Sequence, residues 1–290
     1  MSFLAMIVAL VLLQVWGSAS RVHHDSWLPR LQSYGQGLGM SPTISLFFTI
    51  AIPALVLNLV LGLLESLLFG LLWIGATALV LLYSFGRGDF QAILQRFRSY
   101  CHNENFESAY LDVQSELAYE PDEEGPATLR DLQLKVQRSV LYEGYQRWFA
   151  VLFYFVLLGP EASLVYRLLQ LCRHDREGQL ARRLMFYADW VPARLLAATF
   201  ALAGDFIRGS EAFLASFKDT QGSASSLLLT TAEAALGAMG VAGAESPVST
   251  SEGAQVGEGD RAASRLAELE SLLSRSATVW LVIISVLVLL

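Results

Sequence analysis

The chain has 290 residues, of which 54% are hydrophobic and 16% are charged, and its mean hydropathy is +0.45. Soluble domains carry about 25% charged residues, so this composition indicates a membrane protein with the lipid bilayer as a partner. A net charge of −7 excludes a general nucleic-acid binder, because neutralising phosphates requires a basic face. The 2 cysteines and 4 histidines lack ligand spacing, which excludes a disulfide scaffold and a zinc module.

The N-terminal segment 1–16 is apolar except for Ser2 and Gln14. It is slightly shorter than the ~20 residues that a straight span needs. We interpret it as a retained anchor helix. The alternative is a signal peptide cleaved near the small residues 18–20, which the missing basic n-region disfavours.

The next apolar block, 44–83, contains Glu65 as its single charge. One helix of that length would exceed a ~30 Å hydrocarbon core about twofold, so the block must fold back. We expect a hairpin with spans 44–61 and 64–83 and its turn at Gly62 and Glu65. Glu65 is then either solvated at the tip of the hairpin or functional inside a bundle.

Segment 148–169 resembles a span, but Gly159-Pro160-Glu161 interrupts it and leaves two halves too short to cross. Basic residues flank both ends, and the positive-inside rule would place both flanks in the cytoplasm. We therefore favour a re-entrant pair of helices over a kinked span.

Segment 184–207 carries Asp189, Pro192 and Arg194 inside an otherwise apolar helix. An arginine at the membrane centre costs ~2.5–3.5 kcal/mol on insertion scales, so Arg194 would need a partner. Asp189 or Glu161 would provide one. Alternatively the helix lies at the interface and Arg194 snorkels to water.

The polar insertion 84–147 has amphipathic helical patterns at 90–100, 105–118 and 127–143, with an acidic turn at 120–126. Arginines near its start place this insertion in the cytoplasm. The chain ends in one long helix, amphipathic over 261–275 and apolar over 277–290. With no strand-like alternation, the fold class is all-α, a polytopic helical membrane protein with a helical cytoplasmic insertion. The expected divisions are 1–83 (membrane helices), 84–147 (insertion), 148–217 (broken or spanning helices), 218–260 (disordered linker) and 261–290 (C-terminal helix).

Motifs for phosphate loops, nucleophile elbows, paired metal ligands and dinucleotide turns are missing from the sequence. Three polar clusters remain: Glu143 with Arg147 one helical turn later, Glu161 with Tyr166 and Arg167, and Asp189 with Pro192 and Arg194. Surface pairing and an ordinary proline kink are the alternative readings of the first two.

The sequence DWVPARLLAATFALAGDFIRGSEAFLASF (189–217) resembles the AmpE proteins, inner-membrane regulators associated with inducible β-lactamase expression in Gram-negative bacteria. RWFAVLFYFVLLGPEASLVYRLL (147–169) is similar to the same family, as are the apolar ends and the polar insertion. The resemblance implies a multi-pass protein of the bacterial inner membrane.

AmpE proteins are in turn similar to the CobD/CbiB family, which performs an ATP-dependent amide synthesis on a corrinoid. Tyr166-Arg167 and the run 191–195 fit that family's pattern, and Glu143 takes its glutamate position. Gly144 and Arg147, however, replace its Asn and Asp. Because ATP chemistry needs Mg²⁺ on carboxylate oxygens, these departures imply that the corrinoid chemistry is lost while an anion pocket survives.

The sequence and the resemblance together predict a signalling modulator without catalysis, cofactor or bound metal. Its expected partners are an anionic, cell-wall-derived or other small ligand and a cytoplasmic or membrane signalling protein. An ATP-dependent ligase is the alternative, and transport is a weaker third reading. The predicted ligand-binding residues are Glu143, Arg147, Glu161, Tyr166, Arg167, Asp189, Pro192 and Arg194.

Overall fold

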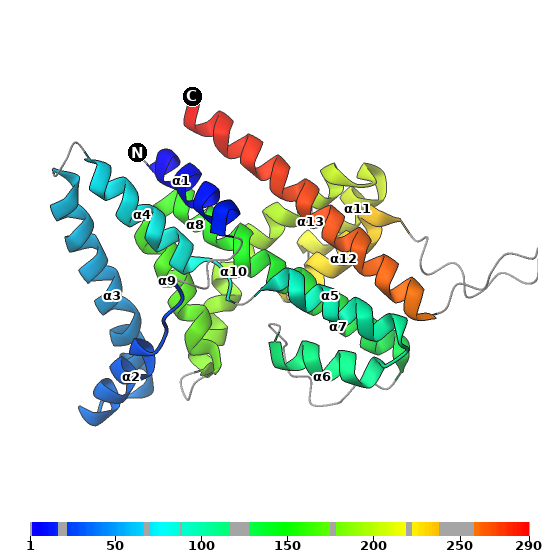
Figure 1. Ribbon diagram of the computed structural model, residues 1–290, viewed down its shortest axis with the longest axis horizontal. Helices are drawn as coiled ribbons and strands as arrows, with labels where there is room; N and C mark the ends of the chain where they lie inside the picture. Colours follow the sequence, from blue (N-terminus) through cyan, green and yellow to red (C-terminus); the bar gives the residue numbers. More distant parts are fainter. Residues whose placement is uncertain are drawn as a thin grey trace, which may run out of the picture. The chain divides into compact units, whose positions relative to one another are not determined.

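The computed structural model describes residues 2–16, 22–66, 70–87, 89–116, 128–174, 178–218, 222–237 and 258–289. Every regular element in these ranges is helical, with no strand among them (Figure 1). The all-α prediction is therefore confirmed. The acidic turn at 120–126 and most of the linker predicted at 218–260 lie outside the described residues.

The elements follow one another along the chain. They are α1 (Ser2–Trp16), α2 (Trp27–Gly37), α3 (Pro42–Glu65), α4 (Leu71–Ser84), α5 (Phe90–His102), α6 (Phe106–Glu116), α7 (Leu129–Gly144), the π-helical turn η3 (Tyr145–Phe149), α8 (Ala150–Leu158), α9 (Pro160–Leu171), the 3-10 turn η4 (Cys172–His174), α10 (Gly178–Ala203), α11 (Phe206–Lys218), α12 (Ala224–Leu236) and α13 (Glu258–Leu289).

The chain forms two compact units. Unit 1 comprises Met1–Gly88 with Gln146–Pro192, and unit 2 comprises Asp89–Tyr145 with Ala193–Leu290. This grouping differs from the predicted division, because the insertion packs with the C-terminal third of the chain. The sequence reveals the apolar face of each helix but not which other face covers it.

Unit 1 is built around α4 and α9. Helix α4 packs against α1 and α9, and α9 also contacts α3 and α8. Leu28, Leu164 and Leu168 are buried together, and apolar residues of α2, α3 and α4 pack against them. Helix α2, the hairpin and α9 therefore share one core, and α1 packs on α4.

The hairpin within unit 1 turns later than the sequence suggested. Ser41 is the N-cap of helix α3, and its side chain accepts a hydrogen bond from the Ile44 amide. The helix continues through Gly62 to Glu65. Gly62 is surrounded by open space, and a helical glycine costs only about 1 kcal/mol, so it does not end the helix. The helix instead continues to Glu65, and α4 begins after Gly70, whose φ of 78° is left-handed.

Two described helices are long and apolar enough to cross a membrane: α3 and the segment Gly259–Val286 of α13. The 24 residues of α3 span about 36 Å at 1.5 Å per residue, somewhat more than a hydrocarbon core of ~30 Å. These lengths and compositions support a membrane protein, without fixing how often the chain crosses.

The apolar segment after η3 breaks at Gly159, between α8 and α9. Gly159 has φ 94° and ψ −179°, a conformation that is almost restricted to glycine. The ring of Tyr154 on α8 stacks on that of Tyr166 on α9 with 5.2 Å between centroids. The two short helices therefore fold back on each other, and re-entry into a bilayer stays a prediction.

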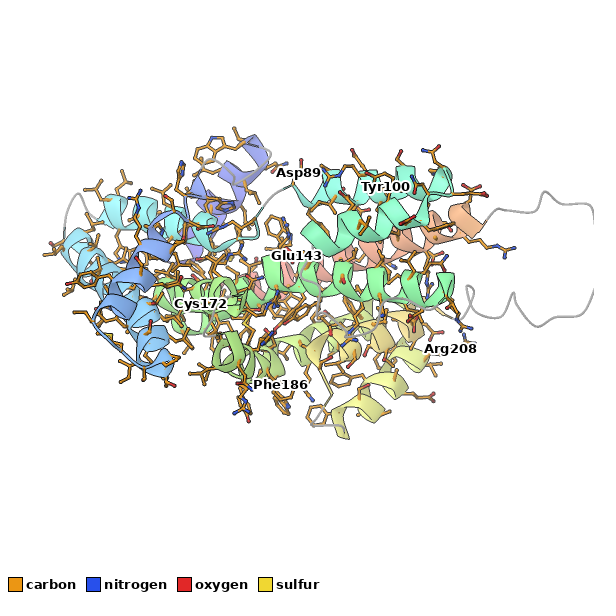
Figure 2. The ribbon with its side chains drawn as sticks, turned by 90° about the horizontal axis from the view of Figure 1, so that it is seen from below. Asp89, Tyr100, Glu143, Cys172, Phe186 and Arg208 are labelled. Carbon is orange, nitrogen blue, oxygen red and sulfur yellow. The ribbon has the colours of Figure 1, made fainter. Side chains whose placement is uncertain are left out.

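Unit 2 joins the polar insertion to the long C-terminal helix. Its core is formed by α5, α6, α7 and the first half of α13, including Phe97, Val140 and Leu266. Figure 2 labels α5 at Tyr100 and α7 at Glu143. An ion pair between Arg98 and Glu270 and a hydrogen bond between His102 Nδ1 and Asp260 Oδ1 at 2.7 Å reinforce the α5–α13 contact. The single C-terminal helix expected from the sequence is present, and its last turns expose apolar side chains.

Candidate functional site

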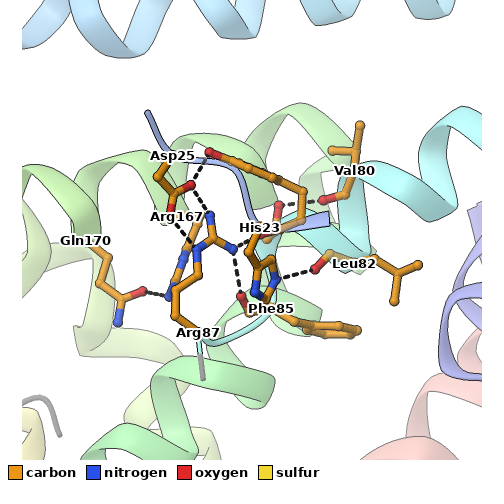
Figure 3. A network of polar contacts seen from close by, with 10 residues as sticks. His23, Asp25, Val80, Leu82, Phe85, Arg87, Arg167 and Gln170 are labelled. Atoms are coloured by element: carbon orange, nitrogen blue, oxygen red, sulfur yellow. Dashed lines mark hydrogen bonds and ion pairs between the residues drawn. The ribbon is translucent and has the colours of Figure 1, made fainter. Parts of the chain in front are cut away.

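A group of polar side chains lies at the C-terminal end of α4 in unit 1. We call it the α4–α9 polar cluster; it consists of His23, Asp25, Tyr83, Arg87, Gln146, Arg167 and Gln170. His23 and Asp25 precede α2, Tyr83 lies in the last turn of α4 and Arg87 follows that helix, Gln146 lies in η3, and the last two belong to α9. Figure 3 shows His23, Asp25, Arg87, Arg167 and Gln170 close together. Four segments of the chain therefore meet at one end of α4.

Asp25 and Arg87 form a bidentate ion pair in this cluster. Arg87 Nε donates to Asp25 Oδ2 at 2.7 Å and Nη2 donates to Oδ1 at 2.6 Å, while the Tyr83 hydroxyl donates to Oδ1 at 2.7 Å. Burial alone would raise the pKa of Asp25, but the hydrogen bonds from Arg87 and Tyr83 outweigh it and hold that pKa below its ordinary value of 3.8. The carboxyl group is therefore ionised at neutral pH.

His23 is the neutral member of the cluster. Its Nε2 lies 3.1 Å from the Leu82 carbonyl, and because a carbonyl only accepts, we assign the proton to Nε2. Burial, and to a smaller extent the positive charge of Arg87, lowers the pKa of His23 from 6.5 to about 4. Nδ1 is buried and has no hydrogen-bond partner among the described residues. It therefore offers an acceptor inside a region that contains two guanidinium groups.

Arg167 is a buried cation, with 3% of its surface exposed. Its Nη1 donates to Gln170 Oε1, and Gln170 Nε2 donates to Gln146 Oε1 at 2.8 Å. Gln146 is 0% exposed, and its Nε2 lacks a hydrogen-bond partner within the described part of the chain. An unsatisfied buried donor costs about 1–3 kcal/mol, so an acceptor at this position would be favourable.

The π-helical turn brings a further predicted residue, Arg147, against the end of α4. A Cβ placed on Gly86 would lie 1.9 Å from Arg147 Cγ, so the aliphatic part of Arg147 passes directly over this glycine. The neighbouring Trp148 ring lies 4.9 Å from Phe85. Because π-turns shift the register of side chains, η3 accounts for this close approach, which helical periodicity would not predict.

A second polar contact in unit 1 joins α9 to α10. The Tyr166 hydroxyl donates to Asp189 Oδ1 at 2.8 Å, and the Tyr154 hydroxyl donates to the Ala188 carbonyl at 2.7 Å. Asp189 is almost fully buried. Asp189, which the sequence analysis placed within an apolar helix, therefore accepts a hydrogen bond from a tyrosine.

The predicted site residues divide between the units. Unit 1 contains six of them, and five of these fall into three places: Arg147 and Arg167 near the end of α4, Tyr166 with Asp189, and Glu161 at the start of α9, where Asn58 Nδ2 donates to it at 3.4 Å. Pro192, the sixth, lies inside α10.

Glu143 and Arg194 are both buried within unit 2. The Arg194 guanidinium lies 5.8 Å from the centre of the Phe217 ring, a distance suited to a cation–π contact. Ligand binding by any of the eight predicted residues stays a prediction.

Sequence reasoning missed His23, Asp25, Tyr83 and Arg87. One local signal was available, since Tyr83 and Arg87 are four residues apart at the end of an apolar helix, where a cation favours the helix terminus. The polar segment 22–26 offered no comparable signal. Its contacts with α4 are 58 to 62 residues away along the chain.

The fold and this cluster define a class: an all-α, membrane-associated protein with a buried, arginine-rich polar cluster. The family described as regulatory signalling modulator protein AmpE matches residues 1–254, and the chain belongs to this family. The chain is also 36% identical over 92 residues to a "Cobalamin biosynthesis protein CobD" from Stutzerimonas stutzeri (strain A1501). That match covers 29% of this chain and 28% of the relative. No solved structure matches.

Proposed function

We propose that this protein is a multi-pass signalling modulator of the bacterial inner membrane that acts in β-lactamase induction and the response to β-lactam or cell-wall stress, without catalysis. The match to the AmpE family over residues 1–254 is the observation that carries this proposal. The membrane-length helices α3 and α13 support the location. The insertion 84–147 would lie in the cytoplasm, where α5, α6 and α7 would meet a signalling partner.

The proposed mechanism places an anionic ligand beside Arg167. Arginine pairs phosphate or carboxylate groups through its planar fork, and Gln146 Nε2 offers a second buried donor. Because Asp25 also interacts with the positive charges of Arg87 and Arg167, an anion there would compete with Asp25 for electrostatic interaction with these two guanidinium groups. Ligand binding would thereby alter the ion pair that joins the segment before α2 to the end of α4. Arg194, in unit 2, is proposed separately as a ligand-binding residue of that unit.

The test is inducible β-lactamase activity in the native host. A deletion strain is compared with the same strain complemented by the wild-type chain and by Arg194→Ala, at matched protein levels. We expect deletion to change induction and the wild-type chain to restore it. Unchanged induction after deletion would contradict the proposed role, and full rescue by Arg194→Ala would remove Arg194 from the ligand site.

The second candidate is an ATP-dependent amide ligase, which the partial similarity to the CobD protein favours. Glu143 would be its acidic residue. Detergent-purified protein would then hydrolyse or bind a nucleotide in the presence of Mg²⁺, and Glu143→Gln would abolish this. Nucleotide turnover that survives Glu143→Gln would assign the activity to a contaminant.

A further inference from the structure

An apolar groove of about 660 Å³ lies between α2 and α3 in unit 1. Its walls are almost entirely hydrocarbon and aromatic, and Pro53 adds its ring to the α3 side. The lining residues are Trp27, Arg30, Leu31, Tyr34, Ile52, Pro53, Val56, Leu57 and Val60. Arg30 is the one charged side chain among them.

The groove has a polar end and an apolar end. Trp27 packs on the same buried leucines as Tyr83, which hydrogen-bonds Asp25 in the polar cluster. Ionised groups at the end of an apolar helix lie at the membrane surface, so Trp27 marks the interface. Val56 and Val60 continue along α3 within its apolar interior, which lies in the hydrocarbon core when α3 spans the bilayer.

The cation at the polar end is available for a ligand. Arg30 is exposed, and its guanidinium makes no hydrogen bond or ion pair with any other part of the chain that the structure describes. Trp27 and Tyr34 flank it, and such aromatic rings favour the headgroup level of a bilayer. An occupant that suits this groove has an anionic head and a flexible hydrocarbon chain.

We propose that the groove between α2 and α3 binds an anionic phospholipid such as phosphatidylglycerol, with one acyl chain along α3 and the phosphate paired with Arg30. This proposal rests on the membrane location put forward above but is independent of any role in β-lactamase induction. A zwitterionic lipid would fill the same hydrocarbon wall, but its own ammonium would offset the attraction to Arg30.

The test uses the full chain in lipid nanodiscs of phosphatidylcholine. Each sample contains a trace of photoreactive lipid with the diazirine on the acyl chain, carrying either a phosphatidylglycerol or a phosphatidylcholine headgroup. Mass spectrometry of peptides then measures labelling of residues 27–34 and 52–60. One arginine near a membrane surface favours an anionic lipid by about fivefold, so we expect that ratio of labelling at the groove.

Two variants and one control sharpen the test. Arg30→Gln should reduce the phosphatidylglycerol labelling to the phosphatidylcholine level, whereas Arg183→Gln, an equal loss of charge at an exposed position of α10, should leave the ratio unchanged. Val56→Trp should block the groove and lower the labelling by both lipids. Inorganic phosphate should not compete, because the acyl chain supplies most of the affinity.

Equal labelling by the two headgroups in the wild-type chain, or an unchanged ratio in Arg30→Gln, would overturn the proposal, since the groove would then hold ordinary surrounding lipid. Absence of lipid labelling anywhere on the chain would instead contradict the membrane location. If lipid labelling of the groove is as expected but deletion of the protein leaves β-lactamase induction unchanged, the proposed function is contradicted and the lipid site is supported.

Discussion

Arg167 is buried and donates to the amide oxygen of Gln170, and the ion pair between Asp25 and Arg87 lies within reach of its charge. Its charge acts on both His23 and Asp25, so these groups belong to one electrostatic unit. The free amide donor of Gln146 in the same cluster as the buried cation makes the cluster receptive to an anion, whereas the neutral His23 adds no donor because its Nδ1 is an acceptor. A purely structural cluster would satisfy each buried donor, and Gln146 Nε2 is not satisfied within the described residues.

The ion pair between Asp25 and Arg87 should contribute measurably to stability. Their side chains are 32% and 21% exposed, so solvent weakens the pair without removing it. Arg87→Gln leaves the Asp25 carboxylate without its cation and should cost about 1 kcal/mol. The midpoint of thermal unfolding in detergent measures this loss. Arg183→Gln is the matched control, and equal midpoints for the two variants would show that the pair is energetically neutral.

The stability of unit 1 should depend on pH through His23. Its pKa is about 4 when folded and 6.5 when exposed, so between these values the unfolded chain binds the extra proton. The free energy of unfolding should therefore fall as the pH is lowered from about 6.5 toward 4, and it should be constant above 6.5. The depressed pKa of Asp25 adds a further loss only below about 3.8.

Unfolding midpoints measured between pH 7.5 and 4.5 check this sign. His23→Gln keeps an amide that can donate to the Leu82 carbonyl but does not titrate, so its profile should be flatter. His24→Gln, at an exposed neighbouring position, should retain the wild-type slope. If His23→Gln and His24→Gln show the same dependence of unfolding midpoint on pH, groups other than His23 are responsible for it.

Among the elements, the α8–α9 pair depends most directly on one residue. Gly159→Ala should lower the free energy of unfolding by about 1–3 kcal/mol, because φ 94° with ψ −179° is strained for any residue with a Cβ. Gly75→Ala makes the same chemical change within α4, where no atom lies within 4 Å of the new Cβ, and should be neutral or stabilising. Thermal unfolding compares the two, and equal effects would contradict the assigned strain.

The helices were largely predictable, but their turns and partners were not. Run length and the Gly159-Pro160 pair located α1, α3 and the break between α8 and α9, because these features depend on local chemistry. Gly62 misled the placement of the hairpin turn, since flanking leucines keep a single glycine helical. The contact of Asp25 with Arg87 depends on packing between distant segments, and the register of Arg147 depends on a π-turn without a sequence signature.

At the scale of the whole molecule, the arginines of the insertion and the hydrogen bonds between segment 22–26 and the end of α4 imply a consistent topology. Residues 22–26 and residues 85–87 lie on the same side of unit 1. From the positive-inside rule we propose that this side is cytoplasmic and that the C-terminal end of α3, at Glu65, faces the periplasm.

Labelling of introduced cysteines tests this topology. In a background with Cys101→Ala and Cys172→Ala, a cysteine at Ser66 should react with a membrane-impermeant thiol reagent in intact spheroplasts. Cysteines at Ser33 and Glu107 should react only after permeabilisation. All three positions are exposed on the protein surface, so accessibility reports the side of the membrane. Reaction at Glu107 in intact cells would place the insertion outside.

The central claim is that signalling depends on the buried cation of the α4–α9 polar cluster. The decisive measurement is β-lactamase induction in the deletion strain complemented by wild type, Arg167→Gln or Arg183→Gln at matched membrane levels. We expect Arg183→Gln to restore induction like the wild type, and Arg167→Gln to behave like the deletion, since an amide lacks the positive charge and the planar fork with which arginine pairs an anion. Wild-type induction with Arg167→Gln would mean that the cluster is structural and that the signal is read elsewhere.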